Sequence, residues 1–269
     1  MSKSIGIISI KGGVGKTTVA ASIASDLVNT YGKRVLLVDA NFSAPNLGHH
    51  MDVLKPQATI GEVLDGSKKI TDSLNNRYGV DVIAGGDFDF NKASIFKLKD
   101  RIDRIKNAYD YVVIDSSPNL NTEVLPTMLA SDLLFVVSTP DLPTLSCSMK
   151  AAELAKNRGK PIAGVIVNKI RNPRYELSLQ EIEKSTGIPV VARIADEDCH
   201  VKSVYSRIPV SIYDKKSNFA KEITQLNAAI TGMKQEPSFW KRIFGSNMRK
   251  EEVNRGLLKD KFYQGIFDN

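Results

Sequence analysis

The sequence predicts an α/β protein with a doubly wound, mostly parallel sheet that is flanked by helices. Short, continuously apolar runs alternate with helical segments along the chain. The runs lack the polar alternation of a sheet with one solvated face, so both faces of each strand are expected to be buried. Alternating strands and helices pack into a parallel sheet through right-handed crossovers. The chain has 269 residues, which is ample for a sizeable core.

The apolar runs give the expected strands in order, and the segments between them give the expected helices. Each strand run is rich in Ile, Val and Leu, and most end at a glycine or a polar residue. Strands are expected over residues 5–10, 34–39, 80–84, 111–115, 133–138, 164–168 and 189–192. Helices are expected over residues 16–31, 144–158, 177–186 and 218–231.

The composition is that of a soluble globular protein, with 42% hydrophobic and 25% charged residues. The formal net charge of +7 favours contact with nucleic acid, an anionic membrane or a nucleotide, and equally fits solubility alone. Cys147 and Cys199 form no Cys-x-x-Cys motif, which disfavours a disulfide scaffold or a zinc site and favours the cytoplasm. We expect no signal peptide and no transmembrane span, so any contact with a membrane would be peripheral.

Residues 11–18, Lys-Gly-Gly-Val-Gly-Lys-Thr-Thr, form a glycine-rich loop between the first strand and the first helix. Backbone N–H groups of such a loop and the helix N-terminus hold phosphate oxygens. Lys16 is expected to reach the β and γ phosphates, and the Thr17 hydroxyl to ligate Mg²⁺, so the expected cofactors are ATP and Mg²⁺. A glycine-rich turn without a ligand is the disfavoured alternative. The expected phosphate-binding residues are Gly12, Gly13, Val14, Gly15, Lys16, Thr17 and Thr18.

Two acidic residues close expected strands. Asp39 ends the second strand and Asp115 the fourth. Ligands of open α/β sheets bind beyond the carboxyl ends of the strands, so both carboxylates are expected to face the phosphates. Each can hold Mg²⁺ or a water bound to it, which makes Thr17, Asp39 and Asp115 the expected metal-site residues. A helix cap or a turn is the alternative role.

Lys11 stands where the usual phosphate loop begins with glycine, and this form resembles the deviant Walker A motif of the MinD/ParA family of ATPases. That family has the P-loop NTPase fold of the SIMIBI class. Residues 38–47 resemble its first switch and residues 115–118 its second, and the resemblance covers residues 3–230 and is closest to archaeal-type MinD-like members. The resemblance implies that Lys11 reaches the partner's nucleotide in a homodimer that ATP assembles.

Asn41 departs from the family pattern, which has a second Asp in the first switch. In the family that Asp positions the attacking water. Asn can orient a water by hydrogen bonding but is a poor base. We therefore expect an ATPase that hydrolyses ATP slowly, with Lys11, Lys16 and Asn41 as its catalytic residues.

The resemblance also places the adenine base. Asn168 and Lys169 follow the strand expected over residues 164–168, where the family has an Asn that hydrogen-bonds adenine. An Asn amide offers a donor and an acceptor, which match one edge of the base. Asp196, in the loop after the next strand, is carried over as a weaker adenine contact. A polar turn at the strand end is the alternative.

The chain divides into an ATPase domain (1–231), a linker (232–237), an amphipathic helix (238–245) and an extension (246–269). In the amphipathic helix the apolar residues fall on one side and the basic ones on the other, as suits an anionic bilayer surface. The segment resembles the C-terminal membrane-targeting helix of MinD proteins, and a terminal helix packed on the core is the alternative. The expected membrane-binding residues are Phe239, Trp240, Lys241, Arg242, Ile243 and Phe244. The extension is expected to be a second amphipathic piece or a docking segment for a partner, with the apolar residues Leu257, Leu258, Phe262, Ile266 and Phe267.

Together these features predict a dimerising switch ATPase that joins the inner face of the cell membrane in its ATP state. Its expected role is to place the cell-division site or to organise other components, with an unidentified regulatory or cargo protein as a further partner. The alternative is a ParA-type partition ATPase that binds DNA non-specifically through basic surface. A second alternative is a metabolic enzyme of the same superfamily. Iron–sulfur relatives would need paired cysteines, which this chain lacks, whereas ATP-dependent amidotransferase or synthetase relatives stay open but would not explain the residues after 237.

Overall fold

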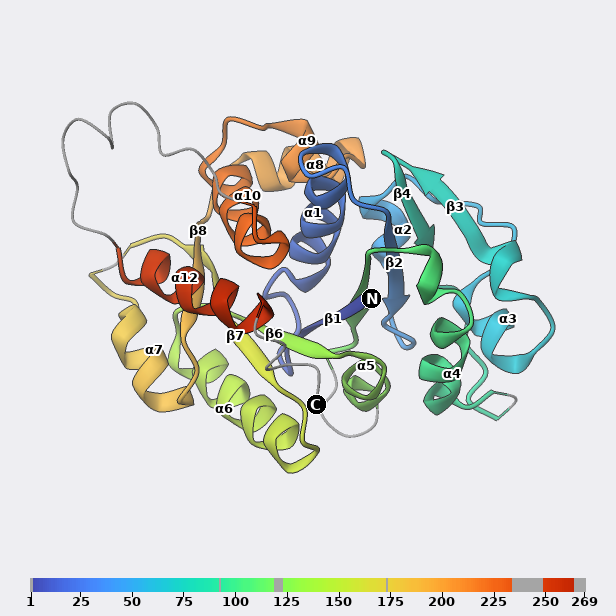
Figure 1. Ribbon diagram of the computed structural model, residues 1–269, viewed down its shortest axis with the longest axis horizontal. Coiled ribbons are helices and arrows are strands. Elements are labelled where there is room, and N and C mark those ends of the chain that lie inside the picture. The colour runs from blue at the N-terminus through green and yellow to red at the C-terminus, as the bar shows by residue number, and fades with distance from the viewer. Residues whose placement is uncertain (1, 92, 119–122, 173, 234–248, 264–269) are drawn as a thin grey trace.

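The computed structural model describes residues 2–91, 93–118, 123–172, 174–233 and 249–263. They build an eight-stranded sheet in the order β3-β4-β2-β5-β1-β6-β7-β8 (Figure 1). Neighbouring strands are parallel, except that β3 and β4 are antiparallel. The predicted doubly wound fold is confirmed. The strands are β1 (Lys3–Ile8), β2 (Val35–Ala40), β3 (Leu74–Arg77), β4 (Val80–Ile83), β5 (Tyr111–Ser116), β6 (Leu133–Ser138), β7 (Ile162–Ile170) and β8 (Val190–Ala195).

Helices cover both faces of the sheet. α1 and α10 lie on one face, together with α9, and α3 to α7 lie on the other (Figure 1). The helices are α1 (Lys16–Asn29), α2 (Leu47–His50), α3 (Ile60–Asp65), α4 (Leu98–Asp103), α5 (Val124–Ala130), α6 (Leu142–Asn157), α7 (Leu179–Thr186), α8 (Cys199–Ser206), α9 (Val210–Tyr213), α10 (Asn218–Thr231) and α12 (Lys250–Tyr263). Short 3₁₀ turns are η1 (Ile70–Ser73), η2 (Ile95–Lys97) and η3 (Lys106–Ala108).

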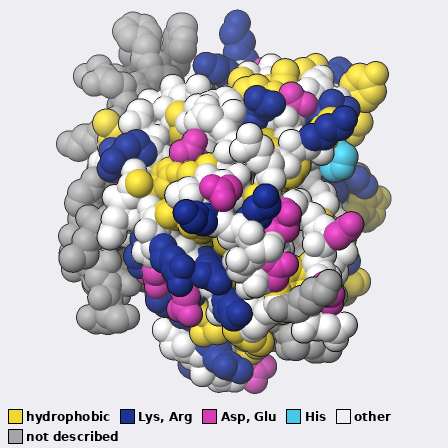
Figure 2. Space-filling view, turned by 90° about the vertical axis from the view of Figure 1, so that its right-hand side faces the viewer, with side chains coloured by type: hydrophobic (Ala, Val, Ile, Leu, Met, Phe, Trp, Pro, Cys, Tyr) yellow, Lys and Arg dark blue, Asp and Glu magenta, His cyan; other side chains and the backbone are white. Residues whose placement is uncertain are grey.

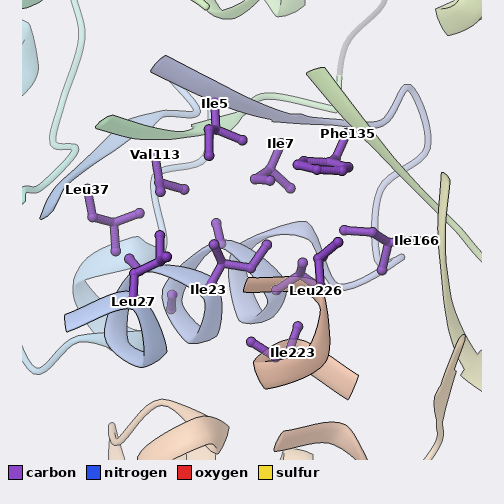
Figure 3. Packing of buried hydrophobic residues seen from close by; sticks show 14 of the residues in the cluster. Ile5, Ile7, Ile23, Leu27, Leu37, Val113, Phe135, Ile166, Ile223 and Leu226 are labelled. Carbon is purple, nitrogen blue, oxygen red and sulfur yellow. The ribbon is translucent and has the colours of Figure 1, made fainter. Parts of the chain in front are cut away.

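The core explains why the strand runs are apolar throughout. Leu37 of β2 points toward α1, where Ile23 and Leu27 meet the side chains of the sheet (Figure 3). Its neighbours Leu36 and Val38 point to the opposite face and pack with α3 and α4. Each such side chain stabilises the fold by roughly 1.5–3 kcal/mol when it is fully buried. Successive residues of one strand therefore serve two cores, which fix the helices on both sides of the sheet.

Two differences from the expected elements affect the site and the sheet edge. β1 ends at Ile8 rather than at residue 10, which leaves residues 9–15 to form the phosphate loop. β3 was not predicted, because its sequence Leu-Asn-Asn-Arg is polar and half-buried or exposed. An edge strand can be polar because one of its sides faces solvent, so an apolar pattern does not reveal it.

The last described helix, α12, packs against β8 and α10. Asn254 Nδ2 donates to the Val190 carbonyl at 2.7 Å, and Leu258 is buried. This part of the extension therefore docks on its own chain. The expected amphipathic helix and most of the linker fall in residues 234–248, outside the described part of the chain, and remain predictions. None of the helices within the described ranges has the length and apolarity to cross a bilayer.

Candidate nucleotide site

The glycine-rich loop joins the end of β1 to the start of α1 in the centre of the sheet (Figure 1). Gly13 and Gly15 have φ angles of +78° and +93°, which side chains rarely adopt. A Cβ at Gly15 would also lie 2.4 Å from Asn168 Nδ2. Glycine is thus required at position 15 for two reasons: the positive φ angle, and the lack of space for a Cβ next to Asn168 of β7. Helix α1 begins at the next residue, Lys16.

Thr17, Asp39 and Asp115 meet at the carboxyl ends of β2 and β5. Asp39 and Asp115 are direct partners in the register of these parallel strands. The Thr17 hydroxyl lies 2.6 Å from Asp115 Oδ2 and 2.9 Å from Asn46 Oδ1. Lys16, Thr17 and both carboxylates are buried. The structure therefore brings Lys16 and Thr17, two of the residues predicted for the phosphates, together with Asp39 and Asp115, which were predicted for Mg²⁺.

The electrostatics of this cluster fit a bound cation. Burial raises the pKa of Asp39 to about 6, although backbone N–H groups oppose the shift. Burial and the nearby Asp39 charge raise the pKa of Asp115 to about 7. Burial lowers the pKa of Lys16. Among the described residues, Asp115 Oδ1 is buried without a hydrogen-bond partner. A divalent cation would supply a partner for this oxygen and favour the ionised carboxylates.

Asp39 and Asp115 differ in how many of their carboxylate oxygens already accept hydrogen bonds from the chain. Asp39 Oδ1 accepts the Asn41 N–H and Oδ2 the Leu47 N–H, each at 3.0 Å. Asp39 therefore also holds the loop that follows β2. With a bond to each oxygen, it fits a contact through a metal-bound water, whereas Asp115 has a free oxygen for direct ligation.

The loop of residues 41–46, which we call the first switch loop, contains Asn41. Asn41 is buried, and its Nδ2 donates to the Ala44 carbonyl at 2.6 Å. Its Oδ1 accepts the Ala44 N–H at 3.4 Å. Both ends of the amide thus bond within the loop. Asn46, the last residue of this loop, accepts a hydrogen bond from the Thr17 hydroxyl, so the first switch loop is in direct contact with the first turn of α1.

Lys11 turns toward α6 of its own chain. Its Nζ lies 3.2 Å from Asp141 Oδ1 and 2.9 Å from Thr144 Oγ1. Asp141 also caps α6 by accepting the Thr144 N–H. Burial opposes ionisation of Asp141, but hydrogen bonds from Thr139, Thr144 and Lys11 lower its pKa to about 2. Lys11 is therefore engaged in a half-exposed ion pair within its own chain.

Two of the three residues predicted for adenine contact the phosphate loop. Asn168 Nδ2 donates to the Val14 carbonyl at 2.8 Å, while its Oδ1 is buried without a partner among the described residues. Lys169, at φ +59°, donates from Nζ to the Gly13 carbonyl at 2.8 Å. The free Oδ1 leaves Asn168 with an acceptor for an amino group.

Asp196 lies on the neighbouring loop after β8. Its carboxylate pairs with Arg171 at 2.6 Å, and its N–H donates to the Ile170 carbonyl at 2.9 Å. The next residue, Glu197, accepts the N–H groups of Asn218 and Phe219 at the start of α10. These contacts connect the end of β7 to α10 and do not reach the phosphate loop. Asp196 was predicted as a weaker adenine contact, and its hydrogen bonds and ion pair do not connect it to the other predicted site residues.

Sequence reasoning did not assign three residues that complete the site. Asn46 lies in the motif that identified the first switch, but its contact with Thr17 depends on the fold. Asp141 and Thr144 carry the N-cap signal of α6, and nothing in that local signal indicates a contact with Lys11. The predicted membrane-binding residues, 239–244, lie outside the described residues.

Comparisons with known proteins agree with this geometry. A family model for an AAA domain matches residues 2–153. An uncharacterised ATP-binding protein of Methanocaldococcus jannaschii is 32% identical over 246 residues, which cover 90% of this chain and 92% of that protein. The cell division ATPase MinD of Pyrococcus furiosus superposes with a TM-score of 0.80 at 28% identity, over 87% of this chain and 100% of that one. The septum site-determining protein MinD of Pyrococcus horikoshii, solved with Mg-ADP, gives a TM-score of 0.78 at 27% identity, over 87% and 97%.

Proposed function

The chain belongs to the MinD/ParA family of ATPases, and from this premise we propose that it is an ATP-driven dimerising switch that associates with a membrane surface in its ATP state. In this role it places the cell-division site or organises other cellular components. The single observation that carries the switch is the Thr17 hydroxyl, which contacts both Asp115 and Asn46. A change at the phosphates is thereby communicated to both switch segments.

ATP and Mg²⁺ fit the buried cluster. Lys16 would hold the β and γ phosphates, and Thr17 and Asp115 would hold the metal, with Asp39 acting through a bound water. The metal would supply positive charge that stabilises the phosphates. The unpartnered oxygens of Asp115 and Asn168 support this arrangement, because buried polar atoms without a partner are costly unless a ligand satisfies them.

Dimerisation would recruit Lys11. Its ion pair with Asp141 is half-exposed, so breaking it costs little. A released Lys11 would have the length and charge to reach the γ-phosphate bound by a second copy. The ATP-bound dimer would be long-lived, because a neutral amide at Asn41 orients water without removing its proton.

Membrane association would follow from dimerisation. A single short amphipathic segment binds a bilayer weakly, whereas two segments held together bind through a high effective concentration. Residues 239–244 combine aromatic and basic side chains, and both kinds favour an anionic membrane interface. Hydrolysis would separate the two copies and release the protein.

The test is sedimentation with anionic vesicles in the presence of ATP, ADP or no nucleotide. Because α12 packs on the core, the segment should be disabled by substitution, with Trp240→Ser and Phe244→Ser together, rather than by truncation. ATP-dependent pelleting of the unaltered chain that this double variant loses supports the proposal. Pelleting that does not depend on nucleotide, or that the variant retains, contradicts it.

A DNA gel shift with the same nucleotides tests the partition alternative. On the face over β3, α3 and α4, acidic side chains lie among the basic ones (Figure 2). Lys99 and Lys106 on this side of the sheet both pair with Asp103. Such pairing reduces the positive field that non-specific DNA binding needs. An ATP-dependent shift without vesicle binding would favour DNA as the surface that this chain joins.

A further inference from the structure

Glu123 is a buried carboxylate at the start of α5, and it is bonded to the first switch loop. It is only 6% exposed. Its Oε2 accepts the Ser43 N–H at 3.3 Å, and its Oε1 accepts the Ser43 hydroxyl. Because one residue supplies both donors, Glu123 fixes the backbone of Ser43 as well as its side chain.

The far end of this contact adjoins a buried helix. Glu123 immediately precedes α5, whose Val124 and Met128 are fully buried beneath the sheet. The carboxylate therefore extends from the start of a buried helix to Ser43, whose neighbour Phe42 is the buried apolar residue of the loop. Ser43 lies 80 positions earlier in the chain, so the contact ties the segment after β2 to the segment after β5.

Side chains hold the first switch loop at both ends and in the middle. Asp39 accepts the Asn41 N–H at one end, and Asn46 bonds to Thr17 of α1 at the other. In the middle, Phe42 packs in the core and Ser43 bonds to Glu123. The Glu123 contact is therefore the polar contact that fixes the middle of the loop, next to Asn41.

We propose that Glu123 is a positioning residue for ATP hydrolysis, acting through Ser43 on the first switch loop. The proposal rests on the ATP-driven switch described above. An amide at position 41 contributes only by orienting water, so its effect depends on placement. A displacement of about 1 Å in such a group can cost on the order of 10²-fold in rate. An anchored loop is therefore essential to a site that lacks the family's second Asp.

The test compares hydrolysis with nucleotide affinity. Single-turnover hydrolysis and the affinity for a fluorescent ATP analogue are measured for the full chain and for Glu123→Ala, Glu123→Gln and Ser43→Ala. Glu123→Ala should slow hydrolysis about 10-fold while affinity changes less than about 2-fold. Glu123→Gln retains one acceptor oxygen and should be slowed about 3-fold, which is partial rescue.

Coupling between the two residues gives an independent readout. Glu123→Ala combined with Ser43→Ala should be no slower than Glu123→Ala alone, because residues that act through one contact are not additive. Glu153→Ala, an exposed glutamate on α6, is the matched control and should leave the rate unchanged.

The outcomes separate this inference from the proposed function. An unchanged rate of hydrolysis in Glu123→Ala overturns the inference that Glu123 positions the first switch loop. Equal losses of rate and affinity, accompanied by a lower Tm and no rescue by Gln, show a structural role and also overturn it. Failure of the unaltered chain to bind and hydrolyse ATP would be seen before any variant is measured, and would contradict the proposed function itself.

Discussion

Two clusters of polar and charged side chains with little exposure to water differ in whether the chain itself supplies all their hydrogen-bond and ion-pair partners. One is the nucleotide cluster of Lys16, Asp39 and Asp115, at the carboxyl edge of the sheet. The other, which we call the edge cluster, comprises Glu183, Glu222, Asn254 and Arg255 where α12 meets β8. Both contain ionisable groups with little exposure to water, but among the carboxylates of these two clusters only Asp115 has a buried oxygen without a hydrogen-bond partner. Glu251 Oε1, next to the edge cluster on α12, also has no hydrogen bond, but it lies 3.9 Å from Arg249 Nη1.

The edge cluster is closely paired. Arg255 donates to Glu222 at 2.8 Å, to the Val191 carbonyl at 3.1 Å and to Gln225 at 2.6 Å. Burial opposes ionisation of Glu183, but bonds from Lys250, the Val190 N–H and Asn254 outweigh it and lower its pKa. In the nucleotide cluster the pKa shifts of both carboxyls go the other way.

The difference indicates what each cluster is for. Buried charges that are paired and hydrogen-bonded hold a segment in one place, and here they hold α12 on the exposed edge of the sheet. Buried charges left incompletely satisfied raise the energy of the free protein and are stabilised when a ligand arrives. If this interpretation is right, substitutions in the two clusters should have opposite consequences for stability and activity.

The largest effect should come from Lys16→Ala. Removing the cation that would meet the phosphates should lower kcat/KM for ATP by about 10²–10³-fold, as expected when one preorganised electrostatic contact to the transition state is lost. The free energy of unfolding should not fall appreciably, because burial already disfavours the charged lysine. Steady-state hydrolysis and chemical denaturation of the same preparation measure both quantities. A variant that is strongly destabilised would show that this cluster is structural.

Arg255→Ala should have the reverse profile. It removes the closer of the two cations that pair with buried Glu222 and leaves only Arg249 at 3.8 Å, so the free energy of unfolding should fall by up to about 3 kcal/mol. The rate of ATP hydrolysis at a temperature where the variant is folded should stay unchanged. Lys261→Ala, an exposed change on the same helix, is the control and should alter neither quantity. Lost hydrolysis in folded Arg255→Ala would mean that α12 contributes to the nucleotide site.

The raised pKa values of Asp39 and Asp115 predict an unusual dependence of stability on pH. Their ordinary pKa is 3.8, and the folded values are about 6 and about 7. Between these limits the folded state binds more protons than the unfolded state, so the free energy of unfolding of the nucleotide-free protein should fall as pH rises. Affinity for Mg²⁺ and nucleotide should rise over the same range, because the metal requires ionised carboxylates.

Thermal unfolding between about pH 5 and 8, without and with Mg²⁺ and ADP, checks this sign. The variant Asp39→Asn should flatten the curve of the free protein, since it removes one titrating group and the charge that raises the pKa of the other. If the Tm of the nucleotide-free protein instead rises steadily with pH across this range, the pKa values of Asp39 and Asp115 are not raised, and the interpretation of the nucleotide cluster is wrong.

The sequence predicted much of the nucleotide cluster because its signals are local. The glycine-rich loop occupies consecutive residues, and Asp39 and Asp115 each end an apolar run. Parallel pairing then places the two carboxylates side by side, as the register of β2 and β5 has them. The doubly wound sheet follows from the same apolar runs.

The edge cluster and the Glu123 contact could not be predicted in this way. α12 is anchored by Asn254 and Arg255, which are polar residues whose burial no apolar periodicity reveals. Glu123 and Ser43 are brought together only when β2 and β5 pair, and although Ser43 lies in the first switch motif, nothing in that motif indicates a contact with Glu123. Strand β3 is likewise too polar to resemble a strand in sequence. Contacts that depend on tertiary pairing of polar groups leave no periodic pattern in the chain.

The smallest effect concerns Lys11, which belongs to neither cluster and is partly exposed. Asp141→Asn removes the charge that holds Lys11 within its own chain, but Asn still caps α6. Exposed ion pairs contribute up to about 1 kcal/mol, so the ATP-dependent dimer should form about 2- to 5-fold more tightly in this variant. Sedimentation velocity with a slowly hydrolysed ATP analogue measures the change, and Lys11→Ala in the same background should abolish the gain. In the free protein Lys11 pairs with Asp141 of its own chain, whereas in the proposed dimer Lys11 is needed at the nucleotide of the other copy. A weaker dimer in Asp141→Asn would contradict this restraint on Lys11. It would indicate that Asp141 itself contributes to the dimer interface.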